Sequence, residues 1–237
     1  MPSSSYRGHG DLLVYYGSGQ LSALATSRRV VLQPGHYTTG EIAALTAQGV
    51  SSLAYLSVGE DTGPTAPWQL AGKNPVWGGS YVDVAHSGWL EHLRGQAEAA
   101  LAAGFTGLLL DTLETPPILG GHRRAALAVV RELRAVVAGG YLLANRGHAL
   151  LADLAPLVDG FLFEAFSTTW EDGYRALRGR ELLDNAARLQ SIRATGRELF
   201  VLDYANRPEL ADFAVSRGAN LEVPVQVTNR DVTGLPG

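Results

Sequence analysis

The sequence predicts an α/β fold in which eight parallel strands close into a barrel, and three observations lead to this prediction. Strand-like runs alternate with helix-like segments along most of the 237 residues. The runs are almost continuously apolar, as in parallel strands that are buried on both faces. Eight such strands with mostly helical crossovers, in a chain of this length, are typical of a single-domain (β/α)8 TIM barrel. An open, doubly wound sheet is the alternative, although it would rarely need eight comparable strands.

The expected elements follow one another at short intervals. The eight strands comprise residues 11–17, 28–33, 53–59, 105–111, 141–145, 159–165, 198–205 and 221–227. Helical patterns occupy residues 40–48, 88–103, 122–138, 181–195 and 207–217. Ser87 is the expected N-cap of the second of these helices. The remaining connections, 18–27 and 147–156, have room for a turn or two of helix at most.

One segment interrupts this rhythm. Residues 61–80 are rich in Gly and Pro and too long for an ordinary connection after the third strand. The YVDVAHSGW that follows indicates a short extra strand leading into a helix. We therefore expect an N-terminal lead-in at 1–10, a barrel at 11–227 with an inserted loop after strand 3, and a C-terminal tail at 228–237.

Composition excludes several classes of function. The formal charge of −4 and the lack of a Lys/Arg block argue against nucleic-acid binding. There is no cysteine, and the six histidines show no metal-ligand spacing, so we expect neither a metal nor another cofactor. The apolar stretches are far shorter than the ~20 residues of a membrane helix. The first ten residues contain no apolar signal segment, which indicates a cytoplasmic protein or an exported protein whose signal was removed.

Two apolar runs end in a carboxylate, GFTGLLLD at Asp111 and DGFLFE at Glu164. The carboxyl ends of barrel strands converge on one face, where active sites lie. The two acids are 53 residues apart, which is about two βα repeats of roughly 30 residues each. They should therefore lie on alternate strands, at a separation that suits the two carboxylates of a glycosidase. The alternative is that Asp111 caps a loop and Glu164 pairs with Arg146.

Other polar and aromatic residues are expected around this pair as a substrate-binding set. Its members are Tyr16, Glu60, Asp83, Asn145, Asp203, Tyr204 and the loop residue Trp77. At the strand ends, Arg146 is the only basic residue. So acidic a face suits a sugar that bears hydroxyls or amines, and Trp77 would offer a surface on which a sugar ring could stack.

Six short motifs occur in an order that resembles one enzyme family. They are YLSVGE (55–60), YVDVAHSGW (81–89), GFTGLLLDTLE (104–114), NRG (145–147), GFLFEAF (160–166) and VLDYA (201–205). Together they resemble glycoside hydrolase family 114, the endo-α-1,4-polygalactosaminidase-like barrels. The resemblance implies a retaining hydrolase of α-1,4-linked galactosamine polymers whose catalytic carboxylates correspond to Asp111 and Glu164. This chain differs from the family pattern in having Glu114 where a second Asp is usual and Arg146 in place of a glycine.

The working hypothesis is a cofactor-independent glycosidase with a polysaccharide or oligosaccharide substrate. Asp111 would be the nucleophile, because the lower intrinsic pKa of Asp keeps it ionised, and Glu164 the general acid/base. Two alternatives remain open at this point. One is a hydrolase of another α-linked glycan, and the other is a carbohydrate-binding barrel without catalytic activity.

Overall fold

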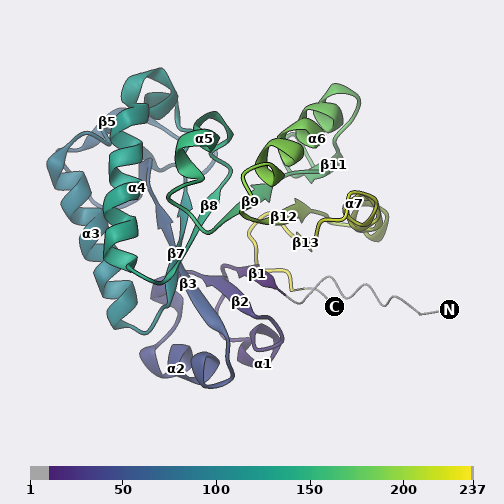
Figure 1. Ribbon diagram of the computed structural model, residues 1–237, viewed down its shortest axis with the longest axis horizontal. Helices are drawn as coiled ribbons and strands as arrows, with labels where there is room; N and C mark the ends of the chain where they lie inside the picture. Colours follow the sequence, from purple (N-terminus) through teal and green to yellow (C-terminus); the bar gives the residue numbers. More distant parts are fainter. Residues whose placement is uncertain (1–10, 236–237) are drawn as a thin grey trace.

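The computed structural model describes residues 11–235 and contains an eight-stranded parallel barrel surrounded by helices (Figure 1). The strands are β1 (Leu12–Tyr15), β2 (Arg29–Leu32), β3 (Ser51–Ser57), β7 (Gly107–Asp111), β8 (Tyr141–Asn145), β9 (Gly160–Glu164), β12 (Glu198–Tyr204) and β13 (Val225–Thr228). Their hydrogen-bonded order is their order along the chain. The predicted (β/α)8 architecture is therefore confirmed. The lead-in expected at 1–10, and residues 236–237 of the expected tail, lie outside the described residues.

The barrel closes between its first and last strands without a regular backbone ladder. The side chain of Gln226 takes the place of a ladder there. Its Oε1 accepts from the N–H of Val14 at 2.7 Å, and its Nε2 donates to the carbonyl of Val14 at 2.8 Å. One amide thus satisfies both backbone groups of a buried residue on β1, as a neighbouring strand would.

Alternate residues of every strand face the two sides of the barrel wall. Val14, Val31, Leu53, Leu109, Leu143, Leu162 and Leu202 belong to the apolar cluster inside the barrel. Their neighbours, such as Leu108 and Leu110 on β7, belong to the cluster between the strands and the helices. Because side chains of a strand alternate with a period of two, an apolar residue at every position is what a wall buried on both faces requires.

Five helices of regular length cover the outside of the barrel. They are α2 (Thr39–Ala47), α3 (Ser87–Ala102), α4 (Arg123–Val137), α6 (Arg180–Arg193) and α7 (Pro208–Asn220). Shorter turns, α1 (Leu21–Leu24) and α5 (Leu151–Leu154), fill the two brief connections. The N-cap of α3 is His86 rather than the expected Ser87. His86 has the extended backbone of a cap, and its Nδ1 accepts from the N–H of Gly88 at 3.1 Å.

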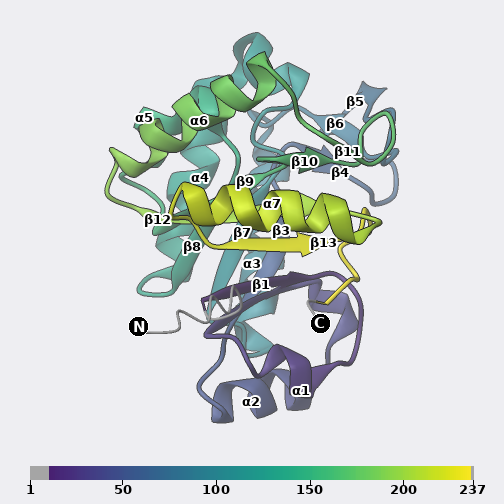
Figure 2. The same cartoon turned by 90° about the vertical axis from the view of Figure 1, so that its right-hand side faces the viewer.

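The inserted segment after β3 forms a small antiparallel sheet of its own. It consists of β4 (Glu60–Asp61), β5 (Gln69–Lys73) and β6 (Ser80–Val82), in the order β4-β6-β5. A hairpin of β10 (Thr168–Thr169) and β11 (Arg175–Ala176) follows β9. Figure 2 shows both small sheets at the end of the barrel toward which the β13 arrow points. Within residues 11–235, no helix has the length and apolar character needed to span a membrane.

Candidate active site

The residues at the mouth of the barrel continue the rows of side chains that face its interior. On β7, β8 and β9, the inward-facing leucines 109, 143 and 162 are each followed two positions later by a polar residue. These polar residues are Asp111, Asn145 and Glu164. The apolar rows below fix the direction of each strand, so the three polar side chains converge above the core.

The amide of Asn145 joins the two acids. Its Nδ2 donates to Oδ1 of Asp111 at 2.8 Å and to Oε2 of Glu164 at 2.7 Å. These two oxygens are therefore at most about 5.5 Å apart, the sum of the two distances. Asp111 and Glu164 lie on strands on either side of β8, as expected for alternate strands. Glu164 takes part in none of the ion pairs found among residues 11–235, so the alternative pairing with Arg146 is absent there.

Phenol groups complete the hydrogen bonding of both carboxylates. Tyr55 Oη donates to Oδ2 of Asp111 at 2.7 Å, and Tyr204 Oη donates to Oε1 of Glu164. The ring of Tyr16 lies edge-on against that of Tyr55, with 5.2 Å between centroids. Burial, and then the charges of the nearby carboxylates, raise the pKa of all three tyrosines well above its usual value. They are therefore neutral donors at any physiological pH.

Two opposing effects act on Asp111. Burial and the neighbouring charge of Glu164 raise its pKa, while the hydrogen bonds from Tyr55, Thr112 and Asn145 lower it. The first two effects outweigh the donors, and the pKa is raised. The charge of a carboxylate this close disfavours the ionised form of Asp111. The raised pKa of Asp111 therefore opposes the expectation that the lower intrinsic pKa of Asp keeps this residue ionised.

A left-handed residue follows each of the three convergent side chains. Thr112, Arg146 and Ala165 have φ values of 60°, 55° and 55°, although none is a glycine. This conformation is uncommon for such residues and is strained for a β-branched one. At Thr112 the side chain itself helps to hold the turn, because its Oγ1 accepts from the N–H of Gly59 at 2.7 Å. The backbone therefore turns sharply at the end of each strand, directly after the residue whose side chain lies at the mouth of the barrel.

The carboxylates form the floor of a cleft with two lobes. One lobe of about 450 Å³ includes Tyr16, Tyr55 and Tyr204, and the other, of about 320 Å³, includes Tyr81 and Glu114. Both lobes share a set of lining residues that consists of Glu60, Asn74, Trp77, Asp111, Thr112, Asn145 and Glu164. Volumes of this size are those of small-molecule sites.

Five of the seven expected binding residues line this cleft. They are Tyr16, Glu60, Asn145, Tyr204 and Trp77. The carboxylate of Glu60 accepts from Nδ2 of Asn74 at 2.9 Å, and its pKa is raised because burial outweighs this bond. Trp77 is 53% exposed at the rim, which is unusual for a side chain of this size.

Asp203 and Asp83 do not line the cleft. Asp203 lies between the inward-facing Leu202 and Tyr204, so its side chain points outward from the barrel wall and is fully buried. Its Oδ1 accepts from the N–H groups of Ser167 and Thr168 at 2.8 and 3.0 Å. Asp83 instead accepts from the N–H of Ala85 and lies 3.3 Å from Nδ1 of His122. Both acids hold turns of the chain.

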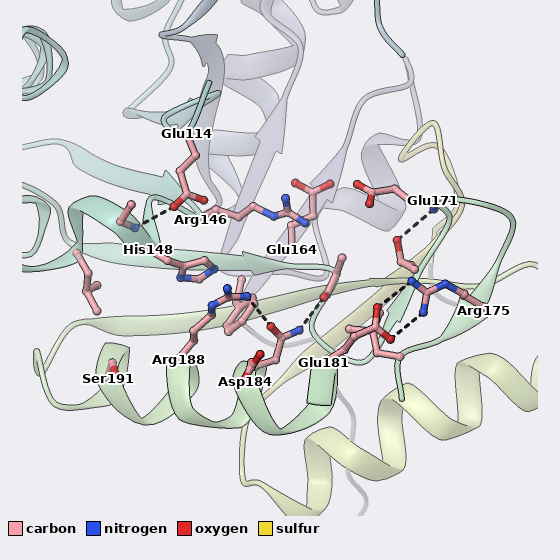
Figure 3. Close-up of a pocket in the computed structure, with 17 residues that line it drawn as sticks. Glu114, Arg146, His148, Glu164, Glu171, Arg175, Glu181, Asp184, Arg188 and Ser191 are labelled. Carbon is pink, nitrogen blue, oxygen red and sulfur yellow. Dashed lines mark hydrogen bonds and ion pairs between the residues drawn. The ribbon is translucent and has the colours of Figure 1, made fainter. Parts of the chain in front are cut away.

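An adjoining cavity of about 730 Å³, which shares Glu164 with the cleft, extends from this residue toward α6 (Figure 3). Glu114, Arg146 and Glu164 lie on one side of it, and Arg188 and Asp184 of α6 lie on the other. Burial alone would lower the pKa of Arg146, but the charges of Glu164 and other nearby carboxylates raise it. Its guanidinium therefore stays charged beside the carboxylate pair.

Several residues that line the cleft were not in the set expected from the sequence, among them Tyr55, Asn74, Trp170 and Arg230. Tyr55 occupies the inward position two residues after Leu53, so the alternation of β3 could have identified it. Asn74, Trp170 and Arg230 come from loops and have no periodic signal in the sequence. Among residues 11–235, no group of three or more His, Cys, Asp or Glu side chains could hold a metal ion.

Comparisons with known proteins identify a family and structures with the same fold. A family model described as glycoside-hydrolase family GH114 matches residues 30–232. The structure of the glycoside hydrolase domain of PelA from Pseudomonas aeruginosa is 27% identical, with a TM-score of 0.84, and the match covers 95% of this chain and 96% of that one.

More distant structures share the fold. Ega3 from Aspergillus fumigatus, solved in complex with galactosamine, has a TM-score of 0.75 at 11% identity, over 94% of this chain and 92% of that one. TtGalA, an alpha-galactosidase from Thermus thermophilus, has a TM-score of 0.63 at 16% identity, over 96% of this chain and 58% of that one. A search of curated proteins found no match.

Proposed function

The chain belongs to glycoside hydrolase family 114, and from this premise we propose that it hydrolyses α-1,4-linked galactosamine-containing polysaccharide with Asp111 and Glu164. The observation that carries the proposal is the amide of Asn145, which holds one oxygen of each acid within hydrogen-bond distance of a single nitrogen. An acid pair held in this way, on the floor of an open cleft, has the arrangement that glycoside hydrolysis requires.

The spacing of the pair favours retention of the anomeric configuration. Retaining glycosidases place their carboxyl groups about 5–5.5 Å apart, whereas inverting enzymes need about 6.5–9.5 Å to admit a water molecule. The upper limit of about 5.5 Å between the bridged oxygens of Asp111 and Glu164 agrees with the shorter range. We therefore propose a covalent glycosyl intermediate rather than direct attack by water.

The proposed reaction has two steps. In the first, a carboxylate oxygen of Asp111 bonds to the anomeric carbon, while Glu164 gives its proton to the departing glycosidic oxygen. In the second, Glu164 takes a proton from water, the water oxygen bonds to the anomeric carbon, and Asp111 leaves as a carboxylate. Tyr55 and Asn145 donate to Asp111 throughout and stabilise the negative charge when it returns.

The cleft suits an amino sugar. Glu60, Asp111 and Glu164 line both lobes, so an ammonium group on the substrate would lie in a negative potential. The galactosamine in the complex of the Aspergillus fumigatus neighbour belongs to this class of ligand. Two lobes that meet at the carboxylates also leave room for sugar units on both sides of the cleaved bond.

Release of reducing ends from partially deacetylated α-1,4-galactosamine polymer tests the proposal. We expect release by the wild type, and a loss of at least ~3 decades of rate in Asp111→Asn and Glu164→Gln with the fold intact. Asp153→Asn is the matched control, because Asp153 is exposed on α5 and lies outside the cleft. More than about a tenth of the activity remaining in Asp111→Asn would rule out its role as the nucleophile.

Azide separates the roles of the two acids. Without the Asp111 carboxylate, azide can attack an activated α-galactosaminide directly, and the product is the β-azide. Without the Glu164 acid, azide replaces water in the second step, and the product is the α-azide. The opposite pattern, with the α-azide from an Asp111→Gly variant, would exchange the two assignments.

A further inference from the structure

Three loops that are far apart in the sequence meet at the rim of the cleft. Trp77 comes from the inserted segment between β5 and β6, Trp170 follows β10, and Arg230 follows β13. The two indole rings lie edge to face, with 5.4 Å between their centroids. The guanidinium carbon of Arg230 is 4.9 Å from the ring centroid of Trp77 and 4.8 Å from that of Trp170. We call these two indoles the tryptophan pair.

The tryptophan pair lies at the junction of the two lobes. Trp77 lines both lobes, Trp170 lines the smaller one and Arg230 the larger one. The ring of Trp170 also stands edge-on to that of Tyr204, at 6.4 Å between centroids, and Tyr204 donates to Glu164. A group bound on the tryptophan pair is therefore two side-chain contacts away from the carboxylates.

Arg230 uses its charge here without an ion pair. It takes part in none of the salt bridges among residues 11–235, although Asp231 lines the same lobe. Its side chain is exposed, and among residues 11–235 the only hydrogen bond of Arg230 is donated by its backbone N–H to Tyr174 Oη. The aromatic faces are thus the partners of the guanidinium. Aromatic rings placed around one cation are the arrangement with which proteins recognise quaternary ammonium ligands.

We infer that the tryptophan pair is a cation site for the ammonium group of a hexosamine unit, and that Arg230 occupies it in the free protein. A charged sugar amine takes the place of the guanidinium on the same two ring faces, and Arg230 then moves into solvent beside Asp231. An N-acetylated unit has no charge and gains no cation–π contact there. The inference rests on the proposed amino-sugar substrate and adds a residue-level reason for preferring deacetylated units.

Removal of the internal competitor should strengthen binding, which is the opposite of the usual effect of deleting a residue at a binding site. We expect Arg230→Ala and Arg230→Gln to bind galactosamine about 2- to 10-fold more tightly than the wild type does. Affinity for N-acetylgalactosamine should change by less than about twofold, because an acetamido group does not compete for the ring faces. Arg230→Lys should resemble the wild type, since an ammonium on a long side chain can occupy the same site.

The measurement is titration calorimetry with the two monosaccharides, alone and in the presence of a second substitution. Trp170→Ala combined with Arg230→Ala should abolish the gain in galactosamine affinity. Arg207→Ala is the control, because Arg207 is an exposed arginine outside both lobes whose guanidinium donates a hydrogen bond to Oδ1 of Asn206. Thermal unfolding of each variant shows that it is folded, and Arg230→Gln retains a polar, uncharged side chain should Arg230→Ala be unstable.

The outcomes separate this inference from the proposed function. Equal gains for both sugars, or no gain for galactosamine, would overturn the inference and would indicate that Arg230 only holds the segment after β13 in place. Selective gains for galactosamine in a protein that releases no reducing ends would retain the cation site and overturn the hydrolase. The two proposals can therefore fail independently.

Discussion

Asn145 is the residue on which the geometry of the site depends most directly. Its Nδ2 is the common donor of the two acids, while its Oδ1 has no partner among the described residues. The orientation of the amide follows from this arrangement, since the opposite orientation would place its oxygen against two carboxylates. Without Asn145, two acids that each disfavour the charge of the other would have no shared donor between them.

Tyr55 donates to Asp111 and not to Glu164, so a substitution at Tyr55 tests the support of one acid more cleanly than a substitution at Asn145 would. Tyr55→Phe removes the phenol that donates to Oδ2 of Asp111 and leaves the ring in place. We expect kcat to fall by about 10- to 1000-fold, because a neutral donor to the reacting carboxylate is lost. Initial rates on the polymer measure this effect.

Tyr37→Phe is the matched control for that change. Tyr37 is also a largely buried tyrosine, but its hydroxyl donates to the carbonyl of Gly19 and does not line the cleft. Rates in Tyr55→Phe as high as those in Tyr37→Phe would show that the phenol of Tyr55 is not needed for the chemistry.

The two carboxylates and their donors Asn145 and Tyr204 could be predicted from the sequence, but most of the loop residues of the cleft could not. Asp111 and Glu164 each end an apolar run, which is a signal visible in the sequence. The expected ligand contact of Asp203 ignored the alternation along β12, where Leu202 and Tyr204 face inward and Asp203 therefore does not. Arg230 and Trp170 meet only because β13 and the hairpin after β9 end at the same mouth of the barrel. No pattern in the local sequence around either residue predicts this contact.

At the scale of elements, the regular parts of the chain were predictable and the irregular parts were not. All eight strands and the five longer helices overlap the ranges expected from the apolar periodicity, although the last strand, β13, begins at Val225 rather than at residue 221. The spacing of apolar residues indicates which positions are buried, and the barrel strands are recognisable because they are buried on both faces. The inserted segment has no such period. Only the extra strand before α3 was therefore expected, and the other two strands of its sheet, β4 and β5, could not be predicted.

Asp203 connects β12 to the hairpin that follows β9, and its effect depends on pH. Burial outweighs the backbone hydrogen bonds that it accepts and raises its pKa to about 6. A carboxyl whose pKa is higher in the folded state binds its proton more tightly there. Its contribution to stability is therefore full below the unfolded value and is lost as the pH rises toward and past 6.

Asp203→Asn removes this titration and retains an acceptor for Ser167 and Thr168. The free energy of unfolding of the wild type should fall between pH 4.5 and pH 7 by more than that of the variant, as measured by urea denaturation at both pH values. Parallel pH profiles for the two proteins would show that Asp203 stays charged, or stays protonated, over the whole interval.

At the scale of the whole molecule, the contact between β1 and β13 is where the barrel differs from a regular one. Gln226→Leu preserves the approximate volume but leaves the N–H and carbonyl of Val14 without partners in a buried position. Each unsatisfied group costs about 1–3 kcal/mol, so we expect the free energy of unfolding to fall by about 2–6 kcal/mol for the two groups. Urea denaturation measures the change.

Gln190→Leu provides the comparison, because Gln190 is exposed on α6. Equal midpoints for the two variants would mean that the segment after β13 closes the barrel without help from Gln226. That segment does contact β1, since the N–H of Tyr16 donates to the carbonyl of Val232 at 2.8 Å.

The three left-handed residues at the mouth have a consequence for the stability margin of the whole protein. Conformations of this kind cost on the order of 1–3 kcal/mol each, whereas domains are stable by only about 5–15 kcal/mol in total. Thr112, Arg146 and Ala165 together can therefore consume a large fraction of that margin. The apolar rows inside and outside the barrel wall must supply the difference, which makes the tightly packed lower barrel a condition for holding Asp111, Asn145 and Glu164 in place.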